Sequence, residues 1–178
     1  MKIAQQLPRT QGDIVVRRLS HGDAAAFAAG TEDPAVRQYG HLPLPEYSEQ
    51  IVRDQIDGVI ADGLADDSLA VLAIADASSD RFLGSIVLFD FIDARAEVGF
   101  WLCPEARGRG AARQALTAAA GLASAAGLTH LTARTVPEND GSRRALESAG
   151  FTWVDGPHRV VTPSGSVTDV LDFELPVV

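Results

Sequence analysis

The sequence is short of cysteine, of long apolar runs and of clustered histidine. Its single cysteine, Cys103, excludes an intrachain disulfide framework and a zinc cage built from thiolates. No apolar run approaches the roughly 20 residues that a transmembrane helix needs, and residues 1–10 lack the apolar core of a signal peptide. We therefore expect a cytoplasmic protein. We also expect no metal, because the four histidines have no ligand spacing: His21, His41, His130 and His158.

Positive charge is also scarce. The chain has 24 Asp and Glu residues against 15 Lys and Arg residues, a net charge of −9 at pH 7. This balance argues against nucleic acid or an anionic membrane as a partner of the whole molecule. Three arginines nevertheless fall within seven positions: Arg107, Arg109 and Arg113. A basic spot in an acidic chain indicates a small anionic ligand rather than a polymer.

The pattern of apolar and turn residues predicts an α+β fold. The length of 178 residues predicts a single domain over residues 1–178, in which residues 1–12 form a loose N-terminal segment. The predicted helices span residues 21–30, 34–39, 48–62, 108–127 and 138–150, and the predicted strands span residues 14–19, 68–75, 81–91, 94–103, 129–136, 151–155 and 167–175. Meandering strands followed by one strand–helix–strand crossover indicate a mixed sheet rather than a doubly wound one.

A glycine-rich run opens the helix predicted at 108–127 and carries the strongest chemical signal: Arg107, Gly108, Arg109, Gly110, Ala111 and Ala112. Glycines let a ligand approach the main chain closely, and the first amides of a helix are unpaired donors at its positive end. The run therefore predicts a diphosphate site, with charge-assisted contacts from Arg107 and Arg109. A dinucleotide fingerprint would need a third glycine, and a P-loop would need Gly-Lys-Ser/Thr. The alternative is a plain helix start.

The same run resembles a motif of the GCN5-related N-acetyltransferase (GNAT) family. Arg107, Gly110 and Ala112 match its Arg/Gln-x-x-Gly-x-Gly/Ala segment. A second match is Asn139-x-x-Ser142, followed by Gly150 and Phe151. The order of elements is also similar over residues 14–175, and the helix at 138–150 resembles that of the RimJ/RimL branch, the ribosomal-protein N-terminal acetyltransferases.

This resemblance implies an α+β, GNAT-type mixed sheet, mostly antiparallel, with a central pair of splayed parallel strands flanked by helices. The splayed pair would be residues 94–103 and 129–136, and acetyl-CoA would lie between them as the cosubstrate. Its diphosphate would bind the amides of residues 108–112. The resemblance gives Asn139 a contact with the pantetheine arm, and an N-cap is its alternative role. A main-chain N–H near Trp101 or Leu102 would stabilise the oxyanion.

Glu97 is the candidate base. It lies mid-strand in an apolar run, and strand alternation places it on the same face as Gly99 and Trp101. Away from bulk water its pKa would rise, which suits a base. The alternative is a structural glutamate in a salt bridge with Arg95 or Arg81. We also expect a β-bulge near the splay point, which would disturb this alternation.

Ser142 is the candidate partner of the departing thiolate. Many relatives place a tyrosine four residues further on, where this chain has Leu146, which cannot donate a proton. The resemblance to the RimJ/RimL branch implies that the serine hydroxyl serves the sulfur instead. The alternative is a serine that caps its own helix.

Together these residues predict an acetyl-CoA-dependent N-acetyltransferase, in which a primary amine attacks directly through a tetrahedral intermediate. The amine-bearing substrate is the N-terminal α-amine of a protein or peptide, or in an alternative a small-molecule amine such as an aminoglycoside. Seven acids in residues 46–67 form either a solvated helix face or a rim that attracts a cationic acceptor. A catalytically silent acyl-CoA-binding module remains open as well. The resemblance also implies a homodimer.

Overall fold

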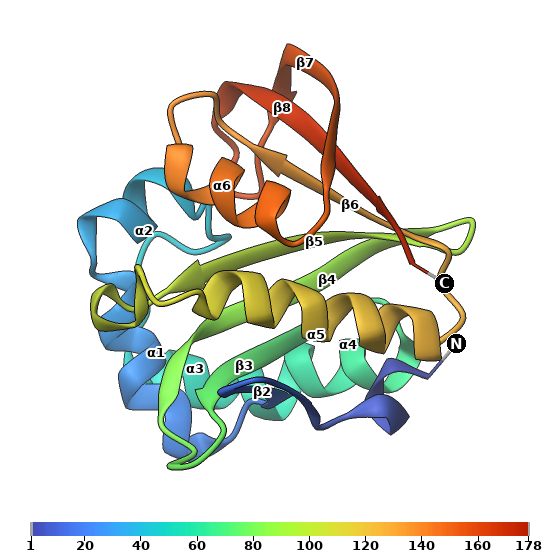
Figure 1. Ribbon diagram of the computed structural model, residues 1–178. Helices are drawn as coiled ribbons and strands as arrows, with labels where there is room; N and C mark the ends of the chain where they lie inside the picture. The colour runs from blue at the N-terminus through green and yellow to red at the C-terminus, as the bar shows by residue number, and fades with distance from the viewer. Residues whose placement is uncertain (1, 178) are drawn as a thin grey trace.

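The computed structural model describes residues 2–177 and contains one sheet of eight strands (Figure 1). The strands follow the order β1-β2-β3-β4-β5-β6-β8-β7. Their bounds are β1 Arg9–Gln11, β2 Ile14–Arg18, β3 Ala70–Asp76, β4 Phe82–Ile92, β5 Arg95–Leu102, β6 His130–Thr135, β7 Thr152–Val161 and β8 Val167–Pro176. All neighbouring strands are antiparallel except β5 and β6. The predicted mixed, mostly antiparallel sheet is confirmed.

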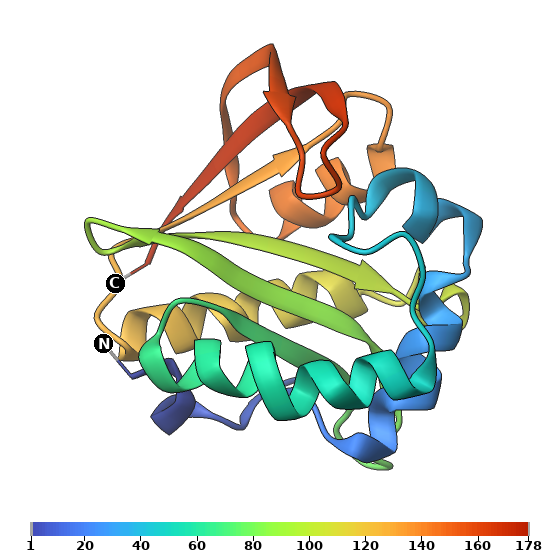
Figure 2. The same cartoon turned by 180° about the vertical axis from the view of Figure 1, so that it is seen from behind.

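Helices cover both faces of the sheet. One face carries α5 and α6 (Figure 1), and the other carries the helices of the first third of the chain (Figure 2). The helices are α1 Ala24–Thr31, α2 Pro34–Tyr39, α3 Glu49–Gln55, α4 Ala61–Asp66, α5 Ala111–Ala125 and α6 Asp140–Ser148. Single turns lie at Ile3–Gln6, His21–Asp23, Ile56–Ile60 and Pro104–Ala106. Alanine and leucine side chains of α5 pack into the larger of two apolar clusters.

The parallel pair β5 and β6 separates soon after it forms. The two strands share a register over only three residue pairs, which end at Glu97 and Thr132. Beyond this point β5 continues to Leu102 beside β4 alone, while β6 continues to Thr135 beside β8. Figure 1 shows β5 and β6 meeting near the C-terminus of the chain and diverging toward α2 and α6. The predicted splayed pair is therefore confirmed, and its splay point is at Glu97.

The helical segment from α3 to α4 is longer than predicted and changes its winding. A π-helical turn spans Ile56–Ile60, and Gly58 within it has the non-helical dihedral angles φ −112° and ψ −109°. Such a turn rotates the following residues about the helix axis. Along this segment Val52 and Ile60 are buried, whereas Ile51 and Val59 are exposed.

The expectation of a loose segment over residues 1–12 is wrong for residues 2–12, which the structure describes. Ile3 is fully buried in the main apolar cluster, and its N–H donates to the Asp67 side chain. β1 pairs with β2 in three register positions. The sequence carries no signal for β1, because Arg-Thr-Gln has no apolar alternation.

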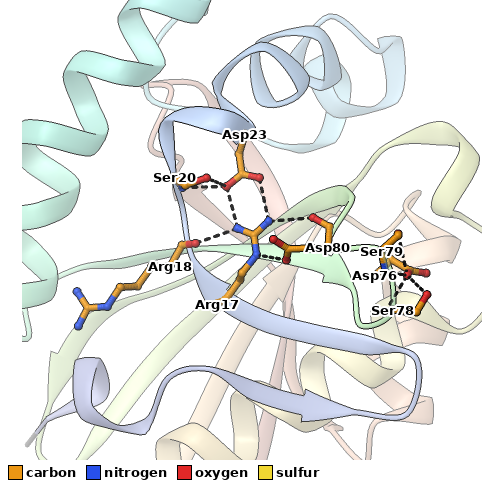
Figure 3. A network of polar contacts seen from close by, with 8 residues as sticks. All are labelled: Arg17, Arg18, Ser20, Asp23, Asp76, Ser78, Ser79 and Asp80. Atoms are coloured by element: carbon orange, nitrogen blue, oxygen red, sulfur yellow. Dashed lines mark hydrogen bonds and ion pairs between the residues drawn. The ribbon is translucent and has the colours of Figure 1, made fainter.

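Arg17 joins three segments at one edge of the sheet (Figure 3). Its guanidinium donates to both carboxylate oxygens of Asp23, at 2.8 and 3.0 Å, and to Asp80 at 2.6 Å. Asp23 also accepts from the main chain and hydroxyl of Ser20. The network therefore fixes the start of α1 and the β3–β4 turn against β2.

Candidate functional site

A cavity of about 970 Å³ opens where β5 and β6 diverge. Both splayed strands line it, together with the α5 N-terminus and α6. Nearly all the predicted site residues lie along this one cavity: Glu97, Trp101, Leu102, Arg107, Gly108, Gly110, Ala111, Ala112, Asn139 and Ser142. Arg109 is the exception, because its side chain is exposed and does not line the cavity.

The N-terminus of α5 has the form of an anion site. Gly108 and Gly110 have φ values of +74° and +76°, which a residue with a side chain rarely adopts. Gly110 is the N-cap and provides no side-chain cap, so the first amides of the helix remain available as donors. A Cβ built at either glycine would meet no atom within 4 Å, so the surface beside these residues is open. A 15-residue helix directs its positive end to this place.

Arg107 has an intramolecular role that the sequence analysis did not foresee. Its guanidinium pairs with the Asp33 carboxylate at 2.6 Å and donates to the Leu102 carbonyl at 2.8 Å. Asp33 in turn caps α2 by accepting from the N–H groups of Ala35 and Val36. The hydrogen bond from Arg107 lowers the pKa of the Asp33 carboxyl, so the pair stays charged. Arg107 thus connects the loop before α5 to the start of α2.

Main-chain groups of β5 face the gap between the splayed strands. The Cys103 N–H donates to the Leu83 carbonyl of β4 at 2.8 Å. Because antiparallel ladders alternate, Trp101 and Gly99 also direct their main-chain groups to β4, whereas Val98, Phe100 and Leu102 direct theirs away from it. The pairing of β5 with β4 is continuous from Glu97 to Leu102, and its register shift lies between Phe89 and Ile92. The bulge therefore adjoins the splay point, as expected, but it lies on β4 and leaves the alternation of β5 from Glu97 to Leu102 undisturbed.

Glu97 lies at the splay point and forms a two-pronged ion pair with Arg134 of β6. The atom pairs are Nε to Oε1 at 2.9 Å and Nη2 to Oε2 at 2.7 Å. The Glu97 side chain is 14% exposed and that of Arg134 is 31% exposed. Burial raises the pKa of Glu97, and the hydrogen bond and charge of Arg134 oppose this rise without cancelling it. Arg134, rather than Arg95 or Arg81, is thus the ion-pair partner.

Asn139 and Ser142 meet at the first turn of α6. The Asn139 side-chain oxygen accepts from the Ser142 N–H at 3.0 Å, so the N-cap role of Asn139 is present. This bond leaves the side-chain NH₂ group of Asn139 as a donor. Leu146, one turn after Ser142, is fully buried and also lines the cavity.

The structure also places three residues with reactive or metal-ligating side chains: His41, Cys103 and His158. His41 lines the cavity with its Nε2 atom buried, and burial lowers its pKa. Cys103 is buried, and this burial raises its pKa to about 11, so the thiolate needed for nucleophilic attack is rare at neutral pH. Among residues 2–177, one group could offer metal ligands within 4.8 Å of one another: Asp155, His158 and Asp172. It lies outside the cavity, and His158 is 3.4 Å from Asp172, an ion-pair distance.

Residues 13–152 match the family model described as Acetyltransferase (GNAT) domain. The chain therefore belongs to the GNAT acetyltransferase family and is an N-acetyltransferase by family. No curated protein matches it in sequence. Within residues 2–177, no helix is both long and apolar enough to cross a membrane.

Solved structures with a similar fold include two of the RimJ/RimL type. RimL, the ribosomal L7/L12 α-N-protein acetyltransferase solved with coenzyme A, has a TM-score of 0.80 at 16% identity, over 94% of this chain and 96% of its own. RimJ from Mycobacterium smegmatis, with CoA-disulfide, has a TM-score of 0.74 at 18% identity, over 95% and 85%. Spermidine N-acetyltransferase from Vibrio cholerae, with CoA and spermine, has a TM-score of 0.76 at 18% identity, over 93% and 96%.

Proposed function

We propose that this protein transfers an acetyl group from acetyl-CoA to a primary amine by direct attack of the amine on the thioester. The observation that carries this proposal is the single cavity, in which a helix N-terminus with two positive-φ glycines continues into a gap between parallel strands. The gap ends at a largely buried carboxylate, that of Glu97, whose side chain is 14% exposed. The similar structures of RimL, RimJ and the spermidine acetyltransferase were solved with CoA or its disulfide, which agrees with this cosubstrate.

The cosubstrate binds along the cavity from α5 toward the splay point. Its diphosphate accepts from the first amides of α5, including Ala111 and Ala112, because these donors face open space at the positive end of the helix. Arg113 lines the cavity and adds a charge-assisted contact. The pantetheine amides pair with the gap-facing main chain of β5, as an added strand would. The NH₂ group of Asn139 donates to this arm from α6.

The groups proposed to take part in the reaction lie along β5, from the splay point at Glu97 to Leu102. The main-chain N–H groups of Phe100 and Leu102 face the gap, whereas that of Trp101 faces β4, so Phe100 and Leu102, and not Trp101, are the candidate donors to the oxyanion of the tetrahedral intermediate. Glu97 takes the proton of the attacking amine, and its raised pKa and position on the cavity wall suit that role. Arg134 holds the carboxylate in one orientation, and the oxygens of Glu97 keep further lone pairs for the amine.

Ser142 donates a hydrogen bond to the departing sulfur. It lines the cavity on α6, where Leu146 occupies the position at which many relatives have tyrosine. A serine hydroxyl is a weak acid, so stabilising the thiolate by hydrogen bonding is the chemically sound role. The raised pKa of Cys103 argues against an acyl-enzyme on that thiol, and direct attack needs no enzyme nucleophile.

Steady-state release of the CoA thiol with a panel of amines tests the proposal. We expect acceptor-dependent release by the wild-type protein. We expect kcat to fall about 100-fold or more in Glu97→Gln, the range of general base catalysis. Calorimetric titration with CoA supplies the control, because Glu97→Gln should bind CoA like the wild type. Binding of CoA with no turnover of any amine would identify a silent acyl-CoA-binding module instead, and full activity of Glu97→Gln would remove Glu97 as the base.

A further inference from the structure

The half of the cavity opposite the cosubstrate groove is lined by aromatic side chains. The chain has two tyrosines, two tryptophans and seven phenylalanines. Both tyrosines, one tryptophan and two phenylalanines line this half, namely Tyr39, Tyr47, Trp101, Phe27 and Phe89, whereas Phe100 lines the cavity from the opposite face of β5. A sequence with only 6% aromatic residues thus concentrates them around a single space. Aromatic side chains bury large apolar areas, so the space is suited to an apolar ligand.

The floor of this half is rigidly packed. Phe27 and Trp101 meet edge to face, with ring centroids 5.1 Å apart, and both are almost fully buried. Tyr47 packs on Phe27 with a centroid distance of 5.8 Å. Gly30 of α1 permits this arrangement, because a Cβ there would lie 2.5 Å from the Trp101 ring. The apolar floor is therefore a closely packed surface and not a loose gap between side chains.

Two polar groups in this half are already engaged, whereas the buried Nε2 atom of His41 has no hydrogen-bond partner among the described residues. The Ser85 hydroxyl donates to the Leu72 carbonyl at 2.9 Å. The Tyr47 hydroxyl accepts from the Leu44 N–H at 3.3 Å. Among residues 2–177, Glu97 is the only carboxylate on the cavity wall. A single carboxylate can match a single ammonium group, and each further charge on a ligand would lose its water without a partner.

The acidic segment 46–67 does not change the number of carboxylates on the cavity wall. None of its seven acids lines the cavity. Asp57 pairs with His21 at 2.7 Å, Glu49 pairs with Arg53 at 2.8 Å, and Asp54 accepts from the Gln50 side chain at 2.8 Å. The segment is therefore a solvated helix face, the first of the two interpretations that the sequence allows, and not a rim of the cavity. Four arginines do line the cavity: Arg107, Arg113, Arg134 and Arg144. Asp33 and Glu97 neutralise two of these arginines, so the wall carries no excess negative charge that would attract a ligand with several positive charges.

We propose that the acceptor is a monoamine carried on an apolar body of about the size of an aromatic ring. This inference rests on the acetyl transfer proposed above and specifies its substrate. The ring packs against the floor made by Phe27 and Trp101, and the amine points to Glu97. A free arylalkylamine and the N-terminal residue of a peptide with a large apolar side chain share this chemistry. Polyamines and aminoglycosides do not, because they carry several ammonium groups.

An acceptor comparison at fixed acetyl-CoA tests this inference. We expect kcat/KM for phenethylamine to exceed that for spermidine or kanamycin by about tenfold or more, since burying a ring is worth more than one decade of affinity. The peptide Phe-Ala-Ala then separates the two sources, and Ser-Ala-Ala should turn over more slowly than Phe-Ala-Ala because it lacks a large apolar side chain. Faster turnover of Phe-Ala-Ala than of phenethylamine would indicate a peptide N-terminus, and the reverse would indicate a free amine.

A pair of matched variants tests whether the acceptor binds in the aromatic half of the cavity. Val59 and Val154 are each 55% exposed, but only Val59 lines the cavity. Val59→Asp should lower the ratio of kcat/KM for phenethylamine to that for spermidine several-fold, because it adds a second carboxylate to the wall. Val154→Asp should leave this ratio unchanged. CoA binding by calorimetry should be equal in both variants, which shows that both are folded.

The outcomes separate this inference from the proposed function. Faster turnover of spermidine or kanamycin than of phenethylamine would overturn the inference and support the proposed acetyl transfer. An equal effect of Val59→Asp and Val154→Asp on the ratio would also overturn it. If no amine were acetylated, the proposed function would fail. Equilibrium dialysis against the CoA complex would then decide the inference: tighter binding of phenethylamine would uphold it, and tighter binding of spermidine would refute it.

Discussion

Replacement of Arg134 by methionine tests the electrostatics of the splay point. The substitution removes both hydrogen bonds to Glu97 and leaves a carboxylate that is only 14% exposed without its partner. Removing one member of a buried ion pair costs about 3–5 kcal/mol, and the 31% exposure of the Arg134 side chain places this pair at the low end, about 3 kcal/mol at pH 7.

The cost should depend on pH in a defined direction. The pKa of Glu97 is already raised by burial, and loss of the Arg134 charge raises it further. A carboxyl group with a raised pKa in the folded state binds more protons there than in the unfolded state, so its contribution to stability falls as pH rises through that pKa. This fall is larger in Arg134→Met. The difference in stability between wild type and variant should therefore be smaller at pH 5 than at pH 8.

Urea denaturation of wild type and Arg134→Met at pH 5 and pH 8 measures this difference. The double variant Arg134→Met/Glu97→Gln is the control, because a neutral amide removes the unpaired charge, so it should recover much of the lost stability. A cost below about 0.5 kcal/mol at pH 8, as for an exposed pair, would refute the reasoning. A cost that is the same at both pH values would refute it as well.

Three further predictions concern other parts of the molecule. Gly110→Ala should lower the free energy of unfolding by about 1 kcal/mol, because φ is +76° and no neighbouring atom opposes a Cβ. The same substitution should weaken CoA binding, as measured by calorimetry. Arg17→Met should lower the free energy of unfolding in urea by about 2–3 kcal/mol, because Asp23 loses its two-pronged partner, whereas Asp80→Asn should cost less because that carboxylate is exposed. Cys103 should react with a thiol reagent at pH 8 more than about a hundredfold slower than free cysteine, because its thiolate is rare and buried; fast labelling would contradict the raised pKa of about 11.

The sequence predicts the elements whose signals are local. The strands of the meander show apolar alternation, and the helices before and after β6 end at Gly127 and Gly150, both with positive φ. Features that depend on tertiary contacts cannot be predicted from the sequence in this way. β1 is held by pairing with β2 and has no apolar pattern, and the π-helical turn at Ile56–Ile60 leaves a run that reads as ordinary helix.

The candidate site likewise contains residues that a local sequence signal predicts and one residue, Arg134, that no local signal predicts. The glycines before α5 and the Asn139-x-x-Ser142 spacing are short, contiguous signals, and they lie on one cavity as expected. Arg134 was missed because it becomes the partner of Glu97 only through the register of β5 and β6. The signal that could have found it is the buried glutamate itself, since a buried carboxylate needs a counter-charge on a neighbouring strand. Thr132 is opposite Glu97, and Arg134 is the next residue on the same face.

The acceptor wall is the part of the site that no sequence motif marks. Its aromatic residues come from α1, α2, the loop before α3, and strands β4 and β5, so they are far apart in the chain and adjacent only in the fold. The acidic segment 46–67 is contiguous and therefore conspicuous in the sequence, yet α3 turns Val52 inward and its acids to the surface. Contiguous charge is thus a poor guide to this pocket. Its specificity depends on the apolar side chains that the splayed sheet and α1 bring together.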